Sequence, residues 1–199
     1  MSKVNRGPAR VWFTSDHHFG HAGIIDTCCR PFRNADEMDA AMVQVWNAVV
    51  RPGDIVWHLG DFAHRADPAR MKSIFQSLAG TKNLVMGNHD KAVTLALGWA
   101  ETTPMRHLVV DGQQLQLCHY AMRVWPGMHR GSLMLYGHSH SRLPGSRQSL
   151  DVGVDNMGFA PVDLPSIRAR MEELPRVSYA HGHEIDEGYD EANEDALTA

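Results

Sequence analysis

The stretch Asp54-Ile-Val-Trp-His-Leu-Gly-Asp-Phe-Ala-His-Arg65 decides how the rest of the chain is interpreted. Its apolar first part predicts a buried parallel strand at 54–59. The strand breaks at Gly60 and presents Asp61 immediately afterwards. Open α/β sheets bind their ligands beyond the carboxyl ends of their strands. Because a carboxylate has two oxygens and can bridge two metal ions, we expect Asp61 to lie at a metal site.

Four further clusters of polar residues each follow a short apolar run. They are Asp16-His-His18, Gly87-Asn-His-Asp90, Cys118-His-Tyr120 and Gly137-His-Ser-His140. Each apolar run has the length of a strand, so five strand ends would present Asp, Asn and His side chains. Oxygen and imidazole ligands of this mixed kind suit catalytic transition metals. The sequence therefore predicts one dinuclear metal centre.

The order of predicted elements indicates an α/β fold class. Predicted strands are 10–15, 54–59, 82–86, 105–110, 113–119, 132–136 and 148–154. Predicted helices are 35–50, one capped by Asp67 and ended by Gly80, a short one within 91–98, and one that starts at Pro165. Asp111-Gly112 predicts a two-residue hairpin turn. The first half thus reads as βαβαβ and the second as mostly antiparallel β, which predicts two stacked sheets with helices outside.

Length and charge predict one domain with a distinct tail. A chain of 199 residues with 43% hydrophobic content can bury one core, which we place at 1–175. Residues 176–199 are acidic and poor in apolar side chains, so we predict a disordered tail. Seven acidic residues and no Lys or Arg lie in 184–199, so the net charge of −4 becomes +3 for residues 1–183. The body is therefore mildly basic.

The cysteines and the N-terminus favour a cytoplasmic protein. Cys28, Cys29 and Cys118 are an odd number without CxxC spacing, so we expect reduced thiols. The first residues lack the apolar region of a signal peptide. No run approaches the ~20 apolar residues of a spanning helix. We therefore expect no membrane partner.

Taken in order, the motifs D-x-H, G-D, G-N-H-D, a strand-end His and G-H-x-H resemble the calcineurin-like metallophosphoesterase family. The resemblance covers roughly residues 10–160, and it is specific because the motifs keep their order at strand ends. Phe13-Thr-Ser-Asp-His-His-Phe-Gly-His21 is similar to small prokaryotic and phage members. The resemblance implies a four-layer αββα sandwich, in which two stacked mixed sheets are flanked by helices.

The same resemblance implies the ligands of two divalent ions, with Asp61 bridging. Site one takes Asp16, His18, Asp61 and His140; site two takes Asp61, Asn88, His119 and His138. We expect Mn²⁺ first, and Fe, Zn²⁺ or Ni²⁺ also suit these ligands. The implied reaction is hydrolysis of a phosphodiester or small phosphate ester by a metal-bridging hydroxide.

Four residues form the predicted catalytic set. His89 matches the family's histidine near the leaving-group oxygen, where it acts as acid or transition-state stabiliser, and Asp90 follows it. His64 stands where many relatives have an Asp that orients that histidine. A neutral His64 could orient His89, but it would not stabilise the cation as a carboxylate would. Arg65 matches a position that holds phosphate in some relatives, and its planar guanidinium suits that role.

Other polar residues have more than one interpretation. His21 lies near the predicted mouth of the site and is a candidate substrate contact. His17 and His58 are interpreted as structural. Asp151 and Asp155 lie on or after the last strand, where a role near the site is an alternative to a structural one.

Three other functions remain alternatives. A non-catalytic scaffold of this fold would tend to lose His89 or a ligand, and all are present. The phosphoesterase class named for an Asp-His-His motif fits residues 16–18, but it usually carries a second domain and does not explain Gly137-His-Ser-His140. A nuclease of this family would have added domains or a basic surface, although short oligonucleotides and cyclic nucleotides remain open. We expect a small phosphate ester or diester rather than long nucleic acid.

Overall fold

A computed structural model of the chain describes residues 8–176. Except for Arg176, the predicted acidic tail at 176–199 lies outside the described residues, as do residues 1–7. The strands are β1 Val11–Thr14, β2 Ile55–His58, β3 Thr81–Val85, β4 Thr102–Thr103, β5 Met105–Val110, β6 Gln113–Cys118, β7 Leu133–Tyr136, β8 Ser149–Asp151 and β9 Val162–Asp163. The helices are α1 Gly23–Thr27, α2 Ala35–Val49, α3 Pro68–Ser77, α4 Ala92–Leu95, the short 3₁₀ helix η1 Met128–Arg130, and α5 Leu164–Glu172. Every predicted strand and helix is present, and α1, β4, β9 and η1 are additional short elements.

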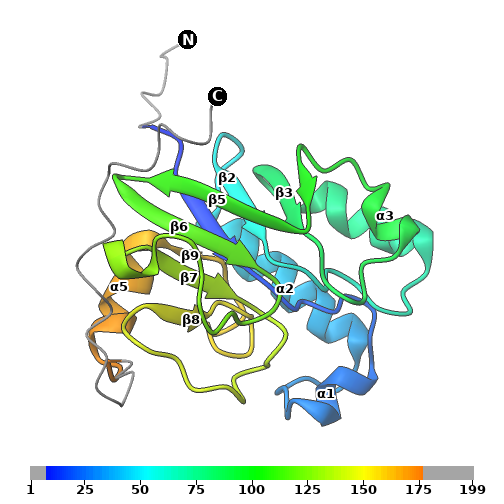
Figure 1. Cartoon of the computed structure of the whole chain (residues 1–199). Helices are drawn as coiled ribbons and strands as arrows, with labels where there is room; N and C mark the ends of the chain where they lie inside the picture. The colour runs from blue at the N-terminus through cyan, green and yellow to red at the C-terminus, as the bar shows by residue number, and fades with distance from the viewer. Residues whose placement is uncertain (1–7, 177–199) are drawn as a thin grey trace.

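The first sheet has the order β4-β3-β2-β1-β9. Strands β1 to β4 pair in parallel, and β9 pairs antiparallel with β1. Helices α2 and α3 cross between the parallel strands, and Figure 1 shows both lying on one side of this sheet. Asn34 and Asp67 cap these helices by accepting backbone N–H groups. The cap at Asp67 confirms the prediction, and the cap at Asn34 is an additional one. The βαβαβ prediction for the first half is confirmed.

The second sheet differs from its prediction. Its order is β5-β6-β7-β8, and β5 pairs antiparallel with β6 through the predicted Asp111-Gly112 turn. However, β6 pairs in parallel with β7, and β7 in parallel with β8, so the prediction of a mostly antiparallel second half is wrong. A parallel connection needs a crossover of about a dozen residues. The irregular segments 119–132 and 137–148 are long enough for that, and they contain no α-helix that would have signalled it.

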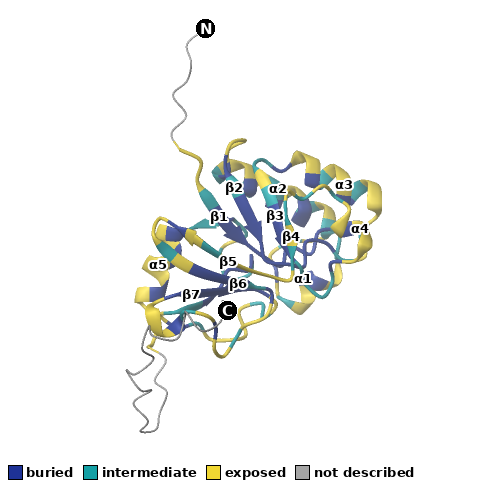
Figure 2. Ribbon diagram, turned by 45° about the horizontal axis from the view of Figure 1, so that its top comes forward, coloured by how far each residue is buried: buried dark blue, intermediate teal, exposed yellow. Residues whose placement is uncertain are grey.

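Alternating side chains divide the core into layers. Trp12 of β1 packs with α2, whereas Phe13 packs between the two sheets. In β7, Leu133 and Leu135 face the first sheet. The intervening Met134 packs on the outer side, against Trp125 and Met128. Figure 2 shows the strands largely buried and the helices exposed on their outer faces.

These layers confirm the predicted fold class of two stacked mixed sheets flanked by helices. Helix α5 contributes Leu164, Ile167 and Met171 to the core between the sheets. On the outer face of the second sheet, the loop that contains η1 is the covering element. Within residues 8–176, no helix has the length and apolar composition needed to cross a bilayer.

The buried carboxylate of Asp54, the residue before β2, forms hydrogen bonds with residues at the start of β1. It accepts hydrogen bonds from Trp12 Nε1 (3.0 Å), Arg10 N (3.1 Å) and the guanidinium of Arg51. Burial opposes the charge, but the bonds from Arg51, Arg10 and Trp12 hold the pKa of Asp54 well below its usual range. Because the pKa of Asp54 is lower in the folded protein, the ionised carboxylate stabilises the fold at pH values above its unfolded-state pKa. This stabilisation is lost as the pH falls through the pKa of the folded state.

We predict that Asp54→Asn lowers the free energy of unfolding by about 2 kcal/mol at pH 7, since hydrogen bonds to a buried charge are lost. Urea unfolding of both proteins at several pH values measures this difference. The gap between wild type and variant should narrow as pH falls below about 4. If the difference in the free energy of unfolding stays constant down to pH 2, the charge of Asp54 does not contribute to stability.

Candidate metal centre

The seven predicted ligands lie at the carboxyl ends of five strands. Asp16 and His18 follow β1, Asp61 follows β2, and Asn88 follows β3. From the second sheet, His119 follows β6, and His138 and His140 follow β7. The parallel registers of β1, β2 and β3 bring their ends to the same edge. The second sheet packs face to face with the first, and the ends of its strands β6 and β7 bring His119 and His138 to Asp61.

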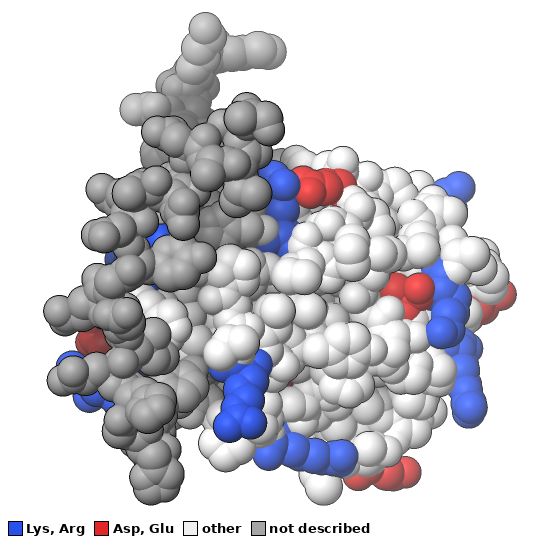
Figure 3. Space-filling model, viewed as in Figure 1, with Lys and Arg blue, Asp and Glu red and all other residues white. Residues whose placement is uncertain are grey.

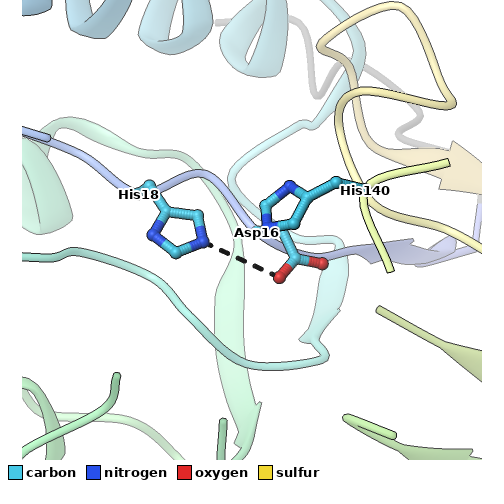
Figure 4. A group of neighbouring side chains, drawn as sticks. All are labelled: Asp16, His18 and His140. Atoms are coloured by element: carbon cyan, nitrogen blue, oxygen red, sulfur yellow. Dashed lines mark ion pairs between the residues drawn. The ribbon is translucent and has the colours of Figure 1, made fainter. Parts of the chain in front are cut away.

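Site one is a compact group at the inner end of this cluster. The ligand atoms of Asp16, His18 and His140 all lie within 4.8 Å of one another. His18 Nε2 is 3.9 Å from Asp16 Oδ1 and 3.6 Å from Asp61 Oδ2. Figure 4 shows a His18 ring nitrogen facing the Asp16 carboxylate, with the His140 ring beside that carboxylate.

Site two shares the Asp61 carboxylate. The ligand atoms of Asp61, His119 and His138 also lie within 4.8 Å of one another. His119 Nε2 is 3.5 Å from Asp61 Oδ2 and 3.1 Å from Asn88 Oδ1. Asp61 Oδ2 therefore faces ring nitrogens of both groups, which is the position that a bridging carboxylate requires.

The residues of site one fit a divalent cation. Asp16 Oδ1 and both ring nitrogens of His18 are buried without a hydrogen-bond partner among the described residues. Such groups are costly to bury unless something binds them. Atoms 3.6–3.9 Å apart are too distant to hydrogen-bond. Two ligands bound at ~2.1 Å to one ion are at most about 4.2 Å apart, so a cation fits between them.

The pKa values of Asp16 and His18 also indicate that site one is suited to a bound cation. Burial raises the pKa of Asp16 to about 8, and the neighbouring Asp61 charge adds to that rise. Burial also holds the pKa of His18 well below its usual range. An unliganded site one would therefore favour a protonated Asp16, whereas a cation stabilises the carboxylate that binds it.

Backbone strain is concentrated at the ligands. Ten non-glycine residues of the described chain have positive φ, and five of them are predicted ligands: Asp16 (59°), His18 (52°), Asp61 (58°), His138 (65°) and His140 (47°). This conformation costs roughly 1–2 kcal/mol for a residue with a Cβ atom. It persists where surrounding contacts fix the backbone. Asp16 N donates to Gly60 O, and His138 N donates to Asp16 Oδ2, so the ligand loops hold one another.

The exposed His138 allows this strain to be measured. We predict that His138→Gly makes the metal-free protein about 1 kcal/mol more stable than His138→Ala, because glycine adopts this conformation without strain. Chemical unfolding of both variants in chelator gives the comparison, and both should bind less metal at site two. Equal stability of the two metal-free variants would contradict the strain account.

Asp90 does not occupy a catalytic position. Its carboxylate accepts backbone N–H groups of Asp61 (2.8 Å), Phe62 (3.0 Å) and Gly87 (2.8 Å). It thus fixes the loop of the bridging carboxylate against the loop that carries Asn88. We therefore replace the predicted catalytic role of Asp90 by a positioning role.

Three further histidines line the mouth of the site. The ring of His64 contacts that of His89, with centroids 4.1 Å apart, and that of His21 at 4.6 Å. Burial lowers the pKa of His64, and burial with the adjacent His64 lowers that of His21 to about 4. Both rings are therefore neutral at pH 7. His89 Nε2 lies 4.0 Å from Asp61 Oδ2, and Arg65 is exposed beside His64.

The other two histidines of the strands form a buried pair. His17 Nδ1 and His58 Nε2 are 2.9 Å apart, and both side chains are fully buried. The structural interpretation of both residues agrees with this placement. Cys28, Cys29 and Cys118 are free thiols.

Three residues outside the predicted ligand and catalytic sets support the site. A role near the site is an alternative that the sequence offers for Asp151 and Asp155, whereas it predicts none for Arg30. Arg30 donates to the Asp16 and His17 carbonyls and to Asp155, which in turn binds His140. Asp151 accepts from Ser139 Oγ (2.5 Å), between His138 and His140. Asp151 ends β8 and Asp155 follows it, so both could be recognised from the sequence as acidic residues after a strand. Arg30 lies in a loop and belongs to no motif.

The chain is similar to several known proteins. The family model described as calcineurin-like phosphoesterase matches residues 9–187. Uncharacterized protein MJ1445 of Methanocaldococcus jannaschii is 30% identical over 172 residues, which are 82% of this chain and 92% of that protein. A Gene 66 protein of a Mycobacterium phage is 27% identical over 179 residues, 74% of this chain and 88% of its own length. The crystal structure of AQ665, a protein of unknown function from Aquifex aeolicus, aligns with a TM-score of 0.65 at 24% identity and covers 82% of this chain and all of its own.

Proposed function

Because this chain belongs to the calcineurin-like phosphoesterase family, we propose that it hydrolyses phosphodiesters or small phosphate esters at a dinuclear metal centre. The observation that carries the proposal is the position of Asp61 Oδ2, 3.6 Å from His18 Nε2 and 3.5 Å from His119 Nε2. One carboxylate thus lies between two groups of ligand atoms. When bound, two divalent cations activate water as the nucleophile and offset the charge of the phosphoryl group.

Mixed oxygen and imidazole ligands determine which cations we propose. Mn²⁺ is our first choice, and Fe, Zn²⁺ and Ni²⁺ fit the same ligand types. Five of the seven ligands hold strained backbone conformations, so the chain is organised for binding before any cation arrives. Asp90 fixes the Asp61 loop in that arrangement.

His89 is the proposed proton donor to the leaving group. Its side chain is 34% exposed, so a substrate can reach a ring whose Nε2 lies 4.0 Å from Asp61 Oδ2. The neutral His64 ring packs edge-on against His89 and restricts its orientation. We propose that the exposed guanidinium of Arg65 holds phosphate oxygens. A neutral His21 would contact the substrate by hydrogen bonding rather than by charge.

A small substrate in the cytoplasm fits these features better than a polymer. On the face shown in Figure 3, Lys and Arg side chains form small groups, some of them beside Asp or Glu, with uncharged surface between the groups. Binding of long nucleic acid draws on many phosphate contacts. The free cysteines suit a reducing compartment. We therefore propose short or cyclic diesters and small monoesters as the substrates to test, and no membrane partner.

The test is a panel of mono-, di- and cyclic phosphate esters assayed on metal-free protein reloaded with Mn²⁺, Ni²⁺, Zn²⁺ or Mg²⁺. We expect turnover only after metal is restored and loss of turnover when chelator is added. A folded protein that holds two ions and cleaves none of these esters would favour the scaffold function. Turnover in excess chelator would contradict the metal-dependent reaction.

A further inference from the structure

Arg30 is a fully buried arginine whose five N–H donors are all used. Its side chain has 0% exposure. Nε donates to Asp155 Oδ1 (2.7 Å), and Nη2 donates to Asp155 Oδ2 (2.9 Å) and Asp16 O (2.7 Å). Nη1 donates to His17 O (2.8 Å) and Met38 Sδ (3.5 Å). A guanidinium has five such donors, so this environment is built for arginine.

Asp155 connects Arg30 to the predicted metal ligand His140. Its Oδ2 lies 2.7 Å from His140 Nδ1, and the side chain of Asp155 is only 8% exposed. Because the carboxylate accepts, Nδ1 carries the proton and Nε2 is left as the nitrogen that can bind a cation. Arg30 holds the backbone of Asp16 at the same time. The pair therefore fixes two ligands of site one, from different sheets, relative to each other.

Among the described residues, the support of site two is a neutral backbone carbonyl rather than an arginine-paired carboxylate. His119 Nδ1 faces the backbone carbonyl of Leu59 at 2.7 Å. His138 is exposed, and the ring that packs against both histidines is the exposed Tyr120. An ion at site two would therefore be held by more accessible ligands, one of them on the surface.

We propose that the Arg30–Asp155 pair positions His140 and so makes site one the tighter of the two metal sites. The inference rests on the proposed dinuclear centre. Partners that orient a ligating histidine raise metal affinity by about 10–100-fold. Asp155 and Arg30 are thus positioning residues that set the order in which the two ions bind and leave.

The test compares Mn²⁺ binding by metal-free wild type, Asp155→Asn and Asp54→Asn, using equilibrium dialysis and calorimetry. Asp54 is the control, since it is an arginine-paired carboxylate that is buried even more deeply than Asp155 and lies at the end of β2 away from the metal site. We expect wild type to show a tight and a weaker ion. Asp155→Asn should weaken the tight ion about 10–100-fold and leave the weaker one unchanged. Asp54→Asn should lower thermal stability without changing either affinity.

Two further variants keep the test decisive. His138→Ala should remove the weaker ion and keep the tight one, which assigns the tight ion to site one. Arg30→Lys keeps the charge but has three donors in place of five, so it should also weaken the tight ion. If Asp155→Asn does not fold, the Mn²⁺ affinity of Arg30→Lys tests the proposal instead.

Unchanged binding of both ions in Asp155→Asn and Arg30→Lys would overturn the inference and leave the dinuclear centre standing. A weakening of the weaker ion alone would overturn it as well. A wild-type protein that binds fewer than two ions would overturn the inference and the dinuclear centre together, so the two failures are distinguishable.

Discussion

Replacing Asp61 with asparagine is expected to remove metal binding and activity together. Asp61 Oδ2 faces His18, His119 and His89, whereas Oδ1 accepts the backbone N–H of His89. The side-chain oxygen of asparagine can still accept the backbone N–H of His89. Its amide nitrogen then faces both metal sites, and an amide nitrogen cannot bind a cation. Two cations close together also repel each other more strongly once the shared negative charge is gone. We expect turnover to fall about 10³-fold or more.

Metal content and activity of Asp61→Asn should be measured on the same preparation, with its circular dichroism compared with that of metal-free wild type. The fold should survive, because the asparagine is isosteric and Asp90 still holds the loop. A variant that keeps two ions and full activity would contradict the bridging role of Asp61.

The second large effect is expected for His89→Ala. His89 is not assigned to either ion, so the variant should keep both ions and the fold. If His89 gives a proton to the leaving oxygen, alkyl phosphate esters should lose about 10²–10⁴-fold in rate. A nitrophenyl ester should lose much less, because its leaving group needs little protonation.

The comparison needs both substrates in both proteins, with metal content measured alongside. His107→Ala, on the exposed part of β5, is a matched control that should leave both rates unchanged. Equal losses on the two esters would mean that His89 acts on the phosphoryl group rather than as an acid. Unchanged rates on both esters would remove His89 from the mechanism.

Much of the fold and the site could be predicted because the signals are local. Buried strands appear as apolar runs, and the residues that follow them share an edge of the sheet by geometry alone. Asp16, Asp61 and Asn88 could therefore be placed together from sequence. The cap at Asp67 works through neighbouring backbone groups, so the start of α3 could be predicted too.

What could not be predicted depends on distant contacts. The parallel pairing of β6, β7 and β8 is set by packing onto the first sheet, since their connections contain no α-helix. The Arg30–Asp155 pair joins residues 125 positions apart, and neither lies in a motif. Asp90 was given a catalytic role because it follows His89, yet its side chain turns to three backbone N–H groups. The direction of a side chain within a loop is not encoded by the order of residues.

The most direct test of the central claim is electron paramagnetic resonance of metal-free wild-type protein titrated with Mn²⁺. A dinuclear centre with ions ~3.5–4 Å apart predicts saturation at two ions per chain and a spin-coupled spectrum at the second equivalent. Asp61→Asn should not give that coupled signal. Saturation at one ion, or two ions with uncoupled spectra, would contradict a centre bridged by Asp61.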